Sequence, residues 1–268
     1  MKFFNRPAKI KASFGMTIPG SGYEYLKELQ NLYPIVPAAD SDRSWWKDMK
    51  KSYLKRTEER EFENNTMKYC PGVYDFSNAG YIVPCLFDMK FYVHSEDGAV
   101  EWEIPEGIPN AWVHAHDKEQ VDSCPIAHGK NTGDHIIKVT TPWFWETPKG
   151  WSTIMTKPFY NYSNDFDVCP GIIDSDLNHM SNHLINVFLR FNVTDKKIIF
   201  DAGQPLCQLI PFERQNTKLI HTEQPDKKEI TLIERSLTRR QSTFSDSPNA
   251  RTGKSLLDYR DPSTKKYK

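Results

Sequence analysis

From residue 70 onward the chain is a succession of short apolar runs separated by residues that favour turns. β-branched and aromatic residues fill the runs, and Pro, Gly, Asn and Asp stand between them. Antiparallel strands have this length and spacing, whereas a parallel sheet would place a helical segment between successive strands. The runs are "YIVPCLF", "MKFYVH", "VEWEI", "HIIKVTT", "STIMTK", "LINVFLRFN", "KIIF" and "LCQLIPF". The sequence therefore predicts a mainly β, antiparallel domain over residues 70–222, with the layers of a sandwich or a distorted jelly roll.

Before residue 70 the apolar residues recur at helical spacing. In "SGYEYLKELQNLYP" they lie between Ser21, which can cap a helix, and Pro34, which stops it. A second helix is predicted over "SDRSWWKDMKKSYLKRTEEREFEN". There Trp46, Met49 and Tyr53 form one stripe, which we assign to the core. The N-terminal part of the chain is therefore expected to be a helical segment.

Three segments follow from these patterns. Residues 1–69 are expected to form an arm and helices packed on the core, and residues 70–222 the antiparallel β domain. Residues 223–268 are polar, basic and poor in large apolar side chains, so we expect an extended tail that cannot bury a core of its own.

Composition and charge exclude several classes of protein. The 35 basic and 35 acidic residues cancel, so the charge gives no reason to expect a nucleic acid or an anionic membrane as a partner. No apolar run approaches the roughly 18 residues of a membrane span, and charge and proline interrupt the N-terminus where a secretory signal would be apolar. The five widely spaced cysteines predict reduced, packed thiols. We expect a cytoplasmic protein, in the host cytoplasm or the virion if the chain is encoded by a phage.

A first candidate site is the histidine-rich stretch "WVHAHDKEQVDSCPIAHGKNTGDHIIKV". An H-x-H on a strand points both imidazoles to one face, and a nearby carboxylate would complete a set of ligands for Fe(II). An H-x-H followed by a Glu resembles the first motif of the cupins, which are metal-binding β proteins. The resemblance implies a non-haem iron oxygenase that holds Fe or another divalent metal with His114, His116, Glu119 and His128. The alternative is a polar loop whose imidazoles bond locally or to solvent.

A second candidate site lies within residues 143–212. Four motifs follow one another there: "PKG" at 148–150, "GIIDSD" at 171–176, "FLRFN" at 188–192 and "GQPLCQLI" at 203–210. In this order and at this spacing they resemble the C-terminal half of the trimeric dUTPases and their relatives, the dCTP deaminases. The resemblance covers about a quarter of the chain and implies a β-clip fold, with a homo-oligomer as the expected assembly.

The same resemblance implies roles for individual residues. The first aspartate of the "GIIDSD" turn, Asp174, would be the general base that orients water onto a nucleotide phosphate, with Mg²⁺ on the triphosphate. Asp176 and Lys157 would lie around the phosphate. Trp151, one of three tryptophans that flank a turn, offers a stacking surface for a base or sugar, unless it belongs to an aromatic core.

The sequence departs from the dUTPase pattern in places that concern chemistry. Where the family continues its turn with Tyr, Arg or Gln, and Gly, this chain has Leu177-Asn178-His179. The phosphate-binding Arg-Ser-Ser loop is replaced by "TKPF". We therefore expect the turn to keep the shape that it has in the family, and we expect the catalytic chemistry to differ.

A further resemblance, over residues 70–215, is to a bacterial and phage domain family of unknown function. It rests on "AHG", "TPKGW" and "F-x-AGQPLC-x-x-IP". Three functional hypotheses follow from these patterns. The first is a diverged dUTPase-like protein that binds or hydrolyses a nucleotide, the second a cupin-like metal enzyme, and the third a non-catalytic phage structural or interaction protein.

Overall fold

The computed structural model of the protein describes residues 10–14, 23–42, 44–58, 61–108, 112–116, 136–159, 164–177 and 184–219. The chain divides into two compact units, one of residues 1–41 with 79–214 and one of residues 42–78 with 215–268. The three predicted segments, 1–69, 70–222 and 223–268, remain a prediction.

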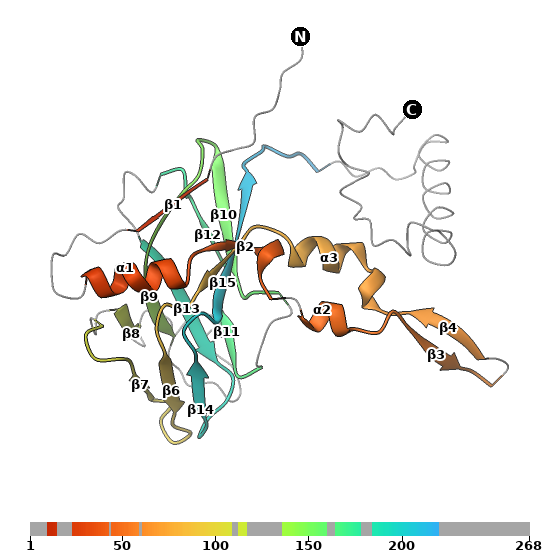
Figure 1. The fold of residues 1–268 in the computed structure, drawn as a ribbon, viewed down its shortest axis with the longest axis horizontal. Helices are drawn as coiled ribbons and strands as arrows, with labels where there is room; N and C mark the ends of the chain where they lie inside the picture. Colours follow the sequence, from red (N-terminus) through yellow and green to blue (C-terminus); the bar gives the residue numbers. More distant parts are fainter. Residues whose placement is uncertain are drawn as a thin grey trace, which may run out of the picture. The chain divides into compact units, whose positions relative to one another are not determined.

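The first unit contains a sheet that carries the "GIIDSD" turn (Figure 1). The order of its strands is β12-β10-β15-β5-β2, and all neighbouring strands are antiparallel. The strands are β2 (Val36–Pro37), β5 (Tyr81–Pro84), β10 (Trp151–Thr156), β12 (Gly171–Ile173) and β15 (Pro205–Glu213). Since β12 pairs only with β10 in this order, it is an edge strand, and the turn that follows it lies at the margin of the sheet.

A second antiparallel sheet of the same unit is built on the long strand β9. The path of the sheet is β1-β9-β13-β11, and β8 also pairs with β9. A third sheet has the order β14-β6-β7. The strands of the two sheets are β1 (Lys11–Phe14), β6 (Met89–Val93), β7 (Val100–Glu103), β8 (Val113–Ala115), β9 (Ile137–Glu146), β11 (Phe166–Val168), β13 (Leu184–Phe191) and β14 (Lys197–Phe200). Helix α1 (Tyr23–Leu32) and the short 3-10 helix η1 (Ala38–Asp40) complete the described part of this unit.

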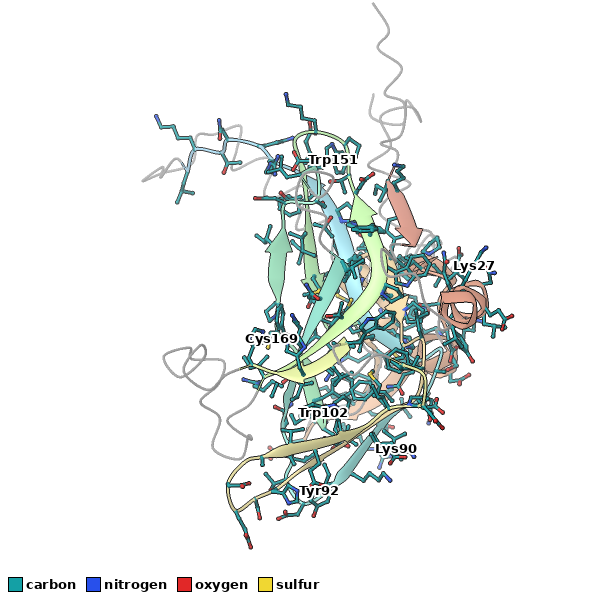
Figure 2. All side chains as sticks on the ribbon, turned by 90° about the vertical axis from the view of Figure 1, so that its left-hand side faces the viewer. Lys27, Lys90, Tyr92, Trp102, Trp151 and Cys169 are labelled. Carbon is teal, nitrogen blue, oxygen red and sulfur yellow. The ribbon has the colours of Figure 1, made fainter. Side chains whose placement is uncertain are left out.

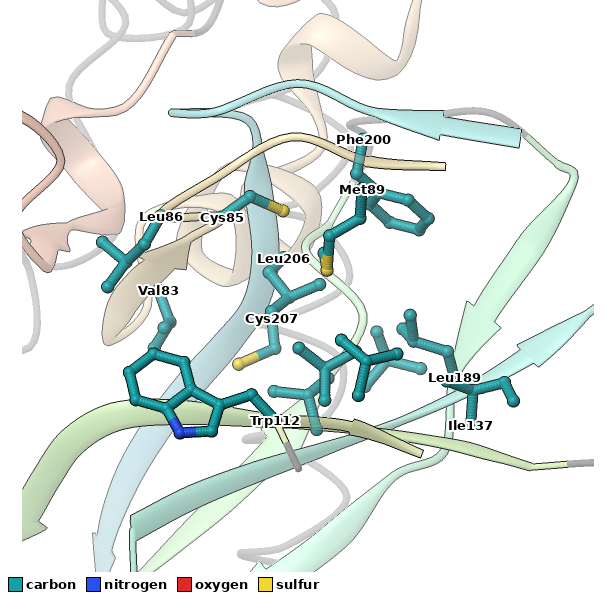
Figure 3. Packing of buried hydrophobic residues seen from close by; sticks show 14 of the residues in the cluster. Val83, Cys85, Leu86, Met89, Trp112, Ile137, Leu189, Phe200, Leu206 and Cys207 are labelled. Atoms are coloured by element: carbon teal, nitrogen blue, oxygen red, sulfur yellow. The ribbon is translucent and has the colours of Figure 1, made fainter. Parts of the chain in front are cut away.

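One apolar core joins the three sheets. Strand β13 buries every second residue, because side chains of a strand alternate between its two faces. Aromatic rings make the contacts between sheets: Tyr81 packs 5.2 Å from Trp145, and Phe91 packs 5.0 Å from Phe191. Figure 3 shows part of this packing, including the buried cysteines of β15 and of the segment after β5. The turn of interest is thus attached to a well-packed body.

The second unit contains short helices and one hairpin. Its described elements are α2 (Ser44–Asp48), β3 (Ser52–Arg56), β4 (Glu61–Asn65), η2 (Met67–Tyr69) and α3 (Pro71–Ser77). Among the described strands, β3 and β4 pair only with each other. Thr66 caps η2, since its side chain accepts a hydrogen bond from the N–H of Lys68.

The prediction of one long second helix is wrong beyond residue 48. Residues 52–56 and 61–65 instead pair as the strands of the β3–β4 hairpin, where Arg56 lies 3.3 Å from Glu61. The predicted apolar stripe is also divided. Trp46 packs 5.5 Å from Tyr74, but Tyr53 lies on β3 and is about half exposed. Spacing along the chain cannot distinguish a charged helix from a charged two-stranded ribbon.

The prediction of a mainly β, antiparallel fold is confirmed. Each apolar run identified in the sequence overlaps a strand, although "YIVPCLF" leaves β5 after Pro84, and every strand pair within the described residues is antiparallel. The helix predicted before Pro34 is present as α1. Within the described ranges no helix has the length and apolar character needed to cross a membrane.

Candidate functional site

The residues that follow β12 form a closed turn. The N–H of Leu177 donates to the carbonyl of Asp174 at 2.9 Å. A second turn is closed by the N–H of Trp151, which donates to the carbonyl of Pro148 at 3.1 Å, and it adjoins the first because the N–H of Thr147 donates to the carbonyl of Ser175 at 3.2 Å. Gly150 occupies the third position of that turn with φ +87°, a conformation that residues with a side chain rarely adopt. The two turns together hold the side chains of residues 174–176.

Ser175 points into the protein, where it is the centre of a chain of hydroxyl groups. The indole N–H of Trp145 donates to Thr153 Oγ1 at 2.9 Å. Thr153 Oγ1 and Thr147 Oγ1 each lie 2.8 Å from Ser175 Oγ. Thr147 donates onward to the carbonyl of Trp151 at 3.3 Å. The carbonyl of Trp151 can only accept, so Thr147 donates its one hydrogen there and must accept from Ser175, which in turn accepts from Thr153; the bonds therefore run in one direction, from Trp145 to Trp151.

Asp174 and Asp176 lie on the other side of the turn, where they meet Arg214. Arg214 Nη1 lies 3.0 Å from Asp174 Oδ1, and Nη2 donates to Asp176 Oδ2. Ser152 Oγ donates to Asp174 Oδ1 at 2.9 Å and accepts from Nη1 at 3.0 Å. The N–H of Gly150 donates to Asp176 Oδ2 at 2.8 Å. We call these residues, Gly150, Ser152, Asp174, Asp176 and Arg214, the carboxylate cluster.

The two carboxylates of the cluster differ in exposure. The side chain of Asp176 is 3 % exposed and that of Asp174 is 62 % exposed, while Arg214, which contacts both, is 39 % exposed. The N–H of Gly150 and the guanidinium of Arg214 hold the pKa of Asp176 below its usual range, and Asp176 raises the pKa of Arg214. Asp176 is therefore ionised and buried, and it binds both Gly150 and Arg214.

Each carboxylate uses one oxygen within the described residues. Every side-chain hydrogen bond of Asp174 to the described part of the chain goes to Oδ1. Oδ1 of Asp176 is buried and accepts no hydrogen bond in that same part. A buried carboxylate oxygen is unfavourable without a donor, so Asp176 depends on the two donors at Oδ2. Asp174, by contrast, has an oriented carboxylate beside solvent.

Trp151 lies next to this cluster. It begins β10, it is paired with Glu213 of β15, and its carbonyl receives the last bond of the hydroxyl chain. Figure 2 shows Trp151 at one end of the strands and Tyr92 and Lys90 at the opposite end. The structure therefore places three of the predicted nucleotide-site residues, Asp174, Asp176 and Trp151, around one pair of turns.

Lys157 is separated from the carboxylate cluster. Its Nζ donates to the carbonyl of Phe166 and lies 3.3 Å from Asp167 Oδ1, 4.8 Å above the ring of Phe166. Five residues of extended chain separate it from Ser152, which corresponds to about 16 Å. The structure therefore does not bring Lys157 to the aspartates, and in this arrangement it binds Asp167.

The two histidines of the predicted metal site lie at β8. His114 is paired with Lys138 of β9, and the rings of His114 and His116 are 6.2 Å apart. The ring of His116 also packs 5.1 Å from Phe188. The other two predicted ligands, Glu119 and His128, lie outside the described residues. Within the described ranges no group of three or more His, Cys, Asp or Glu side chains could hold a metal ion, and the metal site remains a prediction.

Sequence reasoning missed the cation of the cluster, Arg214, and the hydroxyl of Ser152. Their only signal is the register of β10 and β15: Ser152 is paired with Phe212, and the N–H of Arg214 donates to the carbonyl of Gly150. Alternate residues of a strand share a face, so this register brings Arg214 to the face of Ser152. The register itself cannot be read from one sequence.

Solved structures with a remote resemblance to this chain are phage dUTPases. The dUTPase from phage phi11 of S. aureus aligns with a TM-score of 0.28 and 9% identity over 72% of this chain and 97% of its own. The dUTPase of Staphylococcus bacteriophage 80alpha aligns with a TM-score of 0.29 and 9% identity over the same shares. No protein-family model and no curated protein matches the chain.

Proposed function

We propose that the protein binds a nucleotide at the carboxylate cluster, with Asp174 as the residue that contacts the ligand. The observation that carries the proposal is the state of Asp174: its carboxylate is mostly exposed, yet Ser152 and Arg214 fix one of its oxygens. A carboxylate that is already oriented loses little conformational freedom when a ligand binds. Its second oxygen can accept a hydrogen bond from a sugar hydroxyl.

The neighbouring residues suit the same ligand. Arg214 provides a partly exposed guanidinium within 3.0 Å of Asp174, and guanidinium groups match phosphate oxygens in geometry and charge. Trp151, which begins the adjacent strand, is half-buried and offers an aromatic surface. A hydroxyl, a phosphate and a planar base occur together in a nucleotide, and the cluster and Trp151 together offer a complementary group for each.

The proposal concerns binding and not hydrolysis. In the described residues only Asp174 presents an exposed carboxylate within the cluster, because Asp176 is buried and committed to Gly150 and Arg214. Mg²⁺ would enter with the phosphates of the ligand, since this ion commonly uses one carboxylate together with phosphate oxygens and water. Asp174 is the residue that would contact it.

The test is a thermal-shift and calorimetric titration of the full chain with the four deoxynucleoside triphosphates and Mg²⁺. Ligand at a hundred times its Kd should stabilise the fold by about 2.7 kcal/mol. Asp174→Asn should weaken binding at least tenfold because an amide cannot accept equally at both positions. Asp201→Asn, which changes another exposed aspartate, is the matched control and should bind normally. If none of the four nucleotides binds, the proposal is rejected.

A further inference from the structure

We infer that the β3–β4 hairpin is an interaction surface, on which a second copy of this chain binds by pairing its own β3 with β3. The inference is independent of the proposed function and concerns the other unit of the chain. It starts from the isolation of the hairpin, whose strands have no further strand beside them in the part of the chain that the structure describes (Figure 1). Two antiparallel strands alone are only marginally stable in water, and their outer edges present backbone N–H and C=O groups to solvent. A third strand would therefore stabilise the hairpin.

Strand β3 exposes apolar side chains to solvent. Four of its five residues are exposed, among them Tyr53 at 49 % and Leu54 at 66 %. Residues that are paired across two strands share a face, so Leu54 lies on the same face as Glu63 of β4. The other residues that the register places on this face of the two strands are polar: Ser52, Arg56, Glu61 and Asn65. The hairpin itself thus gives Leu54 no apolar neighbour on its face.

The base of the hairpin is fixed by hydrogen bonds within its unit. The N–H of Thr66 donates to the carbonyl of Lys51 at 3.0 Å. Lys68 Nζ donates to the carbonyls of Lys47 and Met49 at 2.8 and 3.0 Å. The exposed strands therefore project from an ordered base, and a strand that is already ordered loses little conformational freedom when a partner binds.

The residue order of β3 suits antiparallel pairing with a second β3. When all five residues pair, Leu54 lies opposite Leu54 of the second copy, and Tyr53 lies opposite Lys55. The two leucines cover each other, and an ammonium group opposite an aromatic ring is favourable. The same full-length pairing of β4 with β4 would place Glu63 opposite Glu63, and like charges in that position are destabilising. The edge of β3 is therefore the one that binds, and the assembly closes as a dimer with two-fold symmetry.

The charges of the two copies are complementary in this register. Arg56 of one copy lies opposite Ser52 of the other, and Ser52 donates to the carboxylate of Glu63 in its own hairpin. Each incoming guanidinium therefore meets a carboxylate, while its own charge is already paired with Glu61 at 3.3 Å. Five paired residues span only about 16 Å, which is less than a standard interface requires, so the dimer should be reversible and depend on concentration.

The first experiment is analytical ultracentrifugation of the full chain over about a hundredfold range of concentration. The wild-type protein should associate as the concentration rises, and Leu54→Lys should raise the Kd of association about tenfold or more. Leu32→Lys is the matched control, because Leu32 of α1 is 67 % exposed and lies outside the hairpin, and it should associate like the wild type. A mass that does not change with concentration, or an association that Leu54→Lys leaves unchanged, would overturn the inference.

A second experiment tests the register of the pairing. Directly opposite residues of antiparallel strands have Cβ atoms about 4.5–5.5 Å apart, close to the separation that a disulfide needs. Under a mild oxidant Leu54→Cys should therefore form a covalent dimer, and mass spectrometry should find the link between position 54 of the two copies. Leu32→Cys should form no such link. A thiol at position 54 that links only within its own chain would show that the hairpin is covered by the same molecule, and this result would also overturn the inference.

Discussion

Ser175→Ala isolates the contribution of the buried hydroxyl chain to stability. Ser175 is fully buried, and its Oγ lies 2.8 Å from the hydroxyls of both Thr147 and Thr153. The bonds run from the indole of Trp145 toward the carbonyl of Trp151, so the substitution leaves Thr153 with a donor that has no acceptor. It also deprives Thr147 of the hydrogen bond that it accepts. Alanine fits the space, and the effect is therefore one of hydrogen bonding.

The magnitude follows from these two lost bonds. A hydrogen bond of this type contributes about 1 kcal/mol net, and an unsatisfied buried hydroxyl adds a penalty of similar size. The free energy of unfolding should fall by about 2–3 kcal/mol. For a domain of this size about 1 kcal/mol changes Tm by about 2–4 °C, so we expect Tm to fall by about 4–12 °C.

The assay is urea unfolding followed by tryptophan fluorescence, with Thr147→Val and the double variant measured beside Ser175→Ala. If the hydroxyls act as one chain, the double variant should lose less stability than the sum of the single variants, by about 0.5 kcal/mol or more. A loss below about 0.5 kcal/mol in Ser175→Ala, together with additive effects in the double variant, would refute the directional hydrogen-bond chain.

Three further predictions concern acid stability, thiol reactivity and glycine. The pKa of Asp176 is below its usual range, so its contribution is complete above the unfolded value of about 4 and is lost as the pH falls through the folded value; urea titrations below pH 4 should show a flatter stability curve in Asp176→Asn. Burial raises the pKa of the Cys85 and Cys207 thiols, so mass spectrometry should find both alkylated only after denaturation. Gly80→Ala should unfold the protein at lower urea than Gly150→Ala, because both glycines have positive φ but only at Gly80 would a Cβ lie 1.9 Å from a backbone oxygen; equal midpoints would contradict this.

The strands could be predicted from the sequence because each depends on residues within one short run. The run "LINVFLRFN" became β13 with alternate residues buried, as its apolar and polar side chains indicate. The β3–β4 hairpin could not be predicted in this way. The spacing of Trp46, Met49 and Tyr53 fits a helix locally, and the reversal of the chain appears only in the pairing of β3 with β4, which includes Arg56 and Glu61.

The candidate site could likewise be predicted only in part, as far as it depends on residues close together in the sequence. Asp174 and Asp176 stand in one hexapeptide, so a short motif is enough to select them. Their separate environments come from residues far away in the chain: Gly150 is 26 residues from Asp176, and Arg214 is 38 residues from it. Local sequence therefore identifies the carboxylates, while the tertiary fold decides which one is buried and which one meets solvent.

The different exposure of neighbouring side chains in the turn also bears on how such a protein can change in evolution. Ser175 and Asp176 serve the interior, so substitutions there are penalised through stability whatever the protein binds. Asp174, which precedes them, has a side chain that is 62 % exposed, so its substitution opens no cavity in the core. Asp174 can therefore be substituted during evolution, either to suit another ligand or after binding is lost, while the fold stays intact. In this turn, the residue that can vary, Asp174, directly precedes the two residues that stabilise the fold, Ser175 and Asp176.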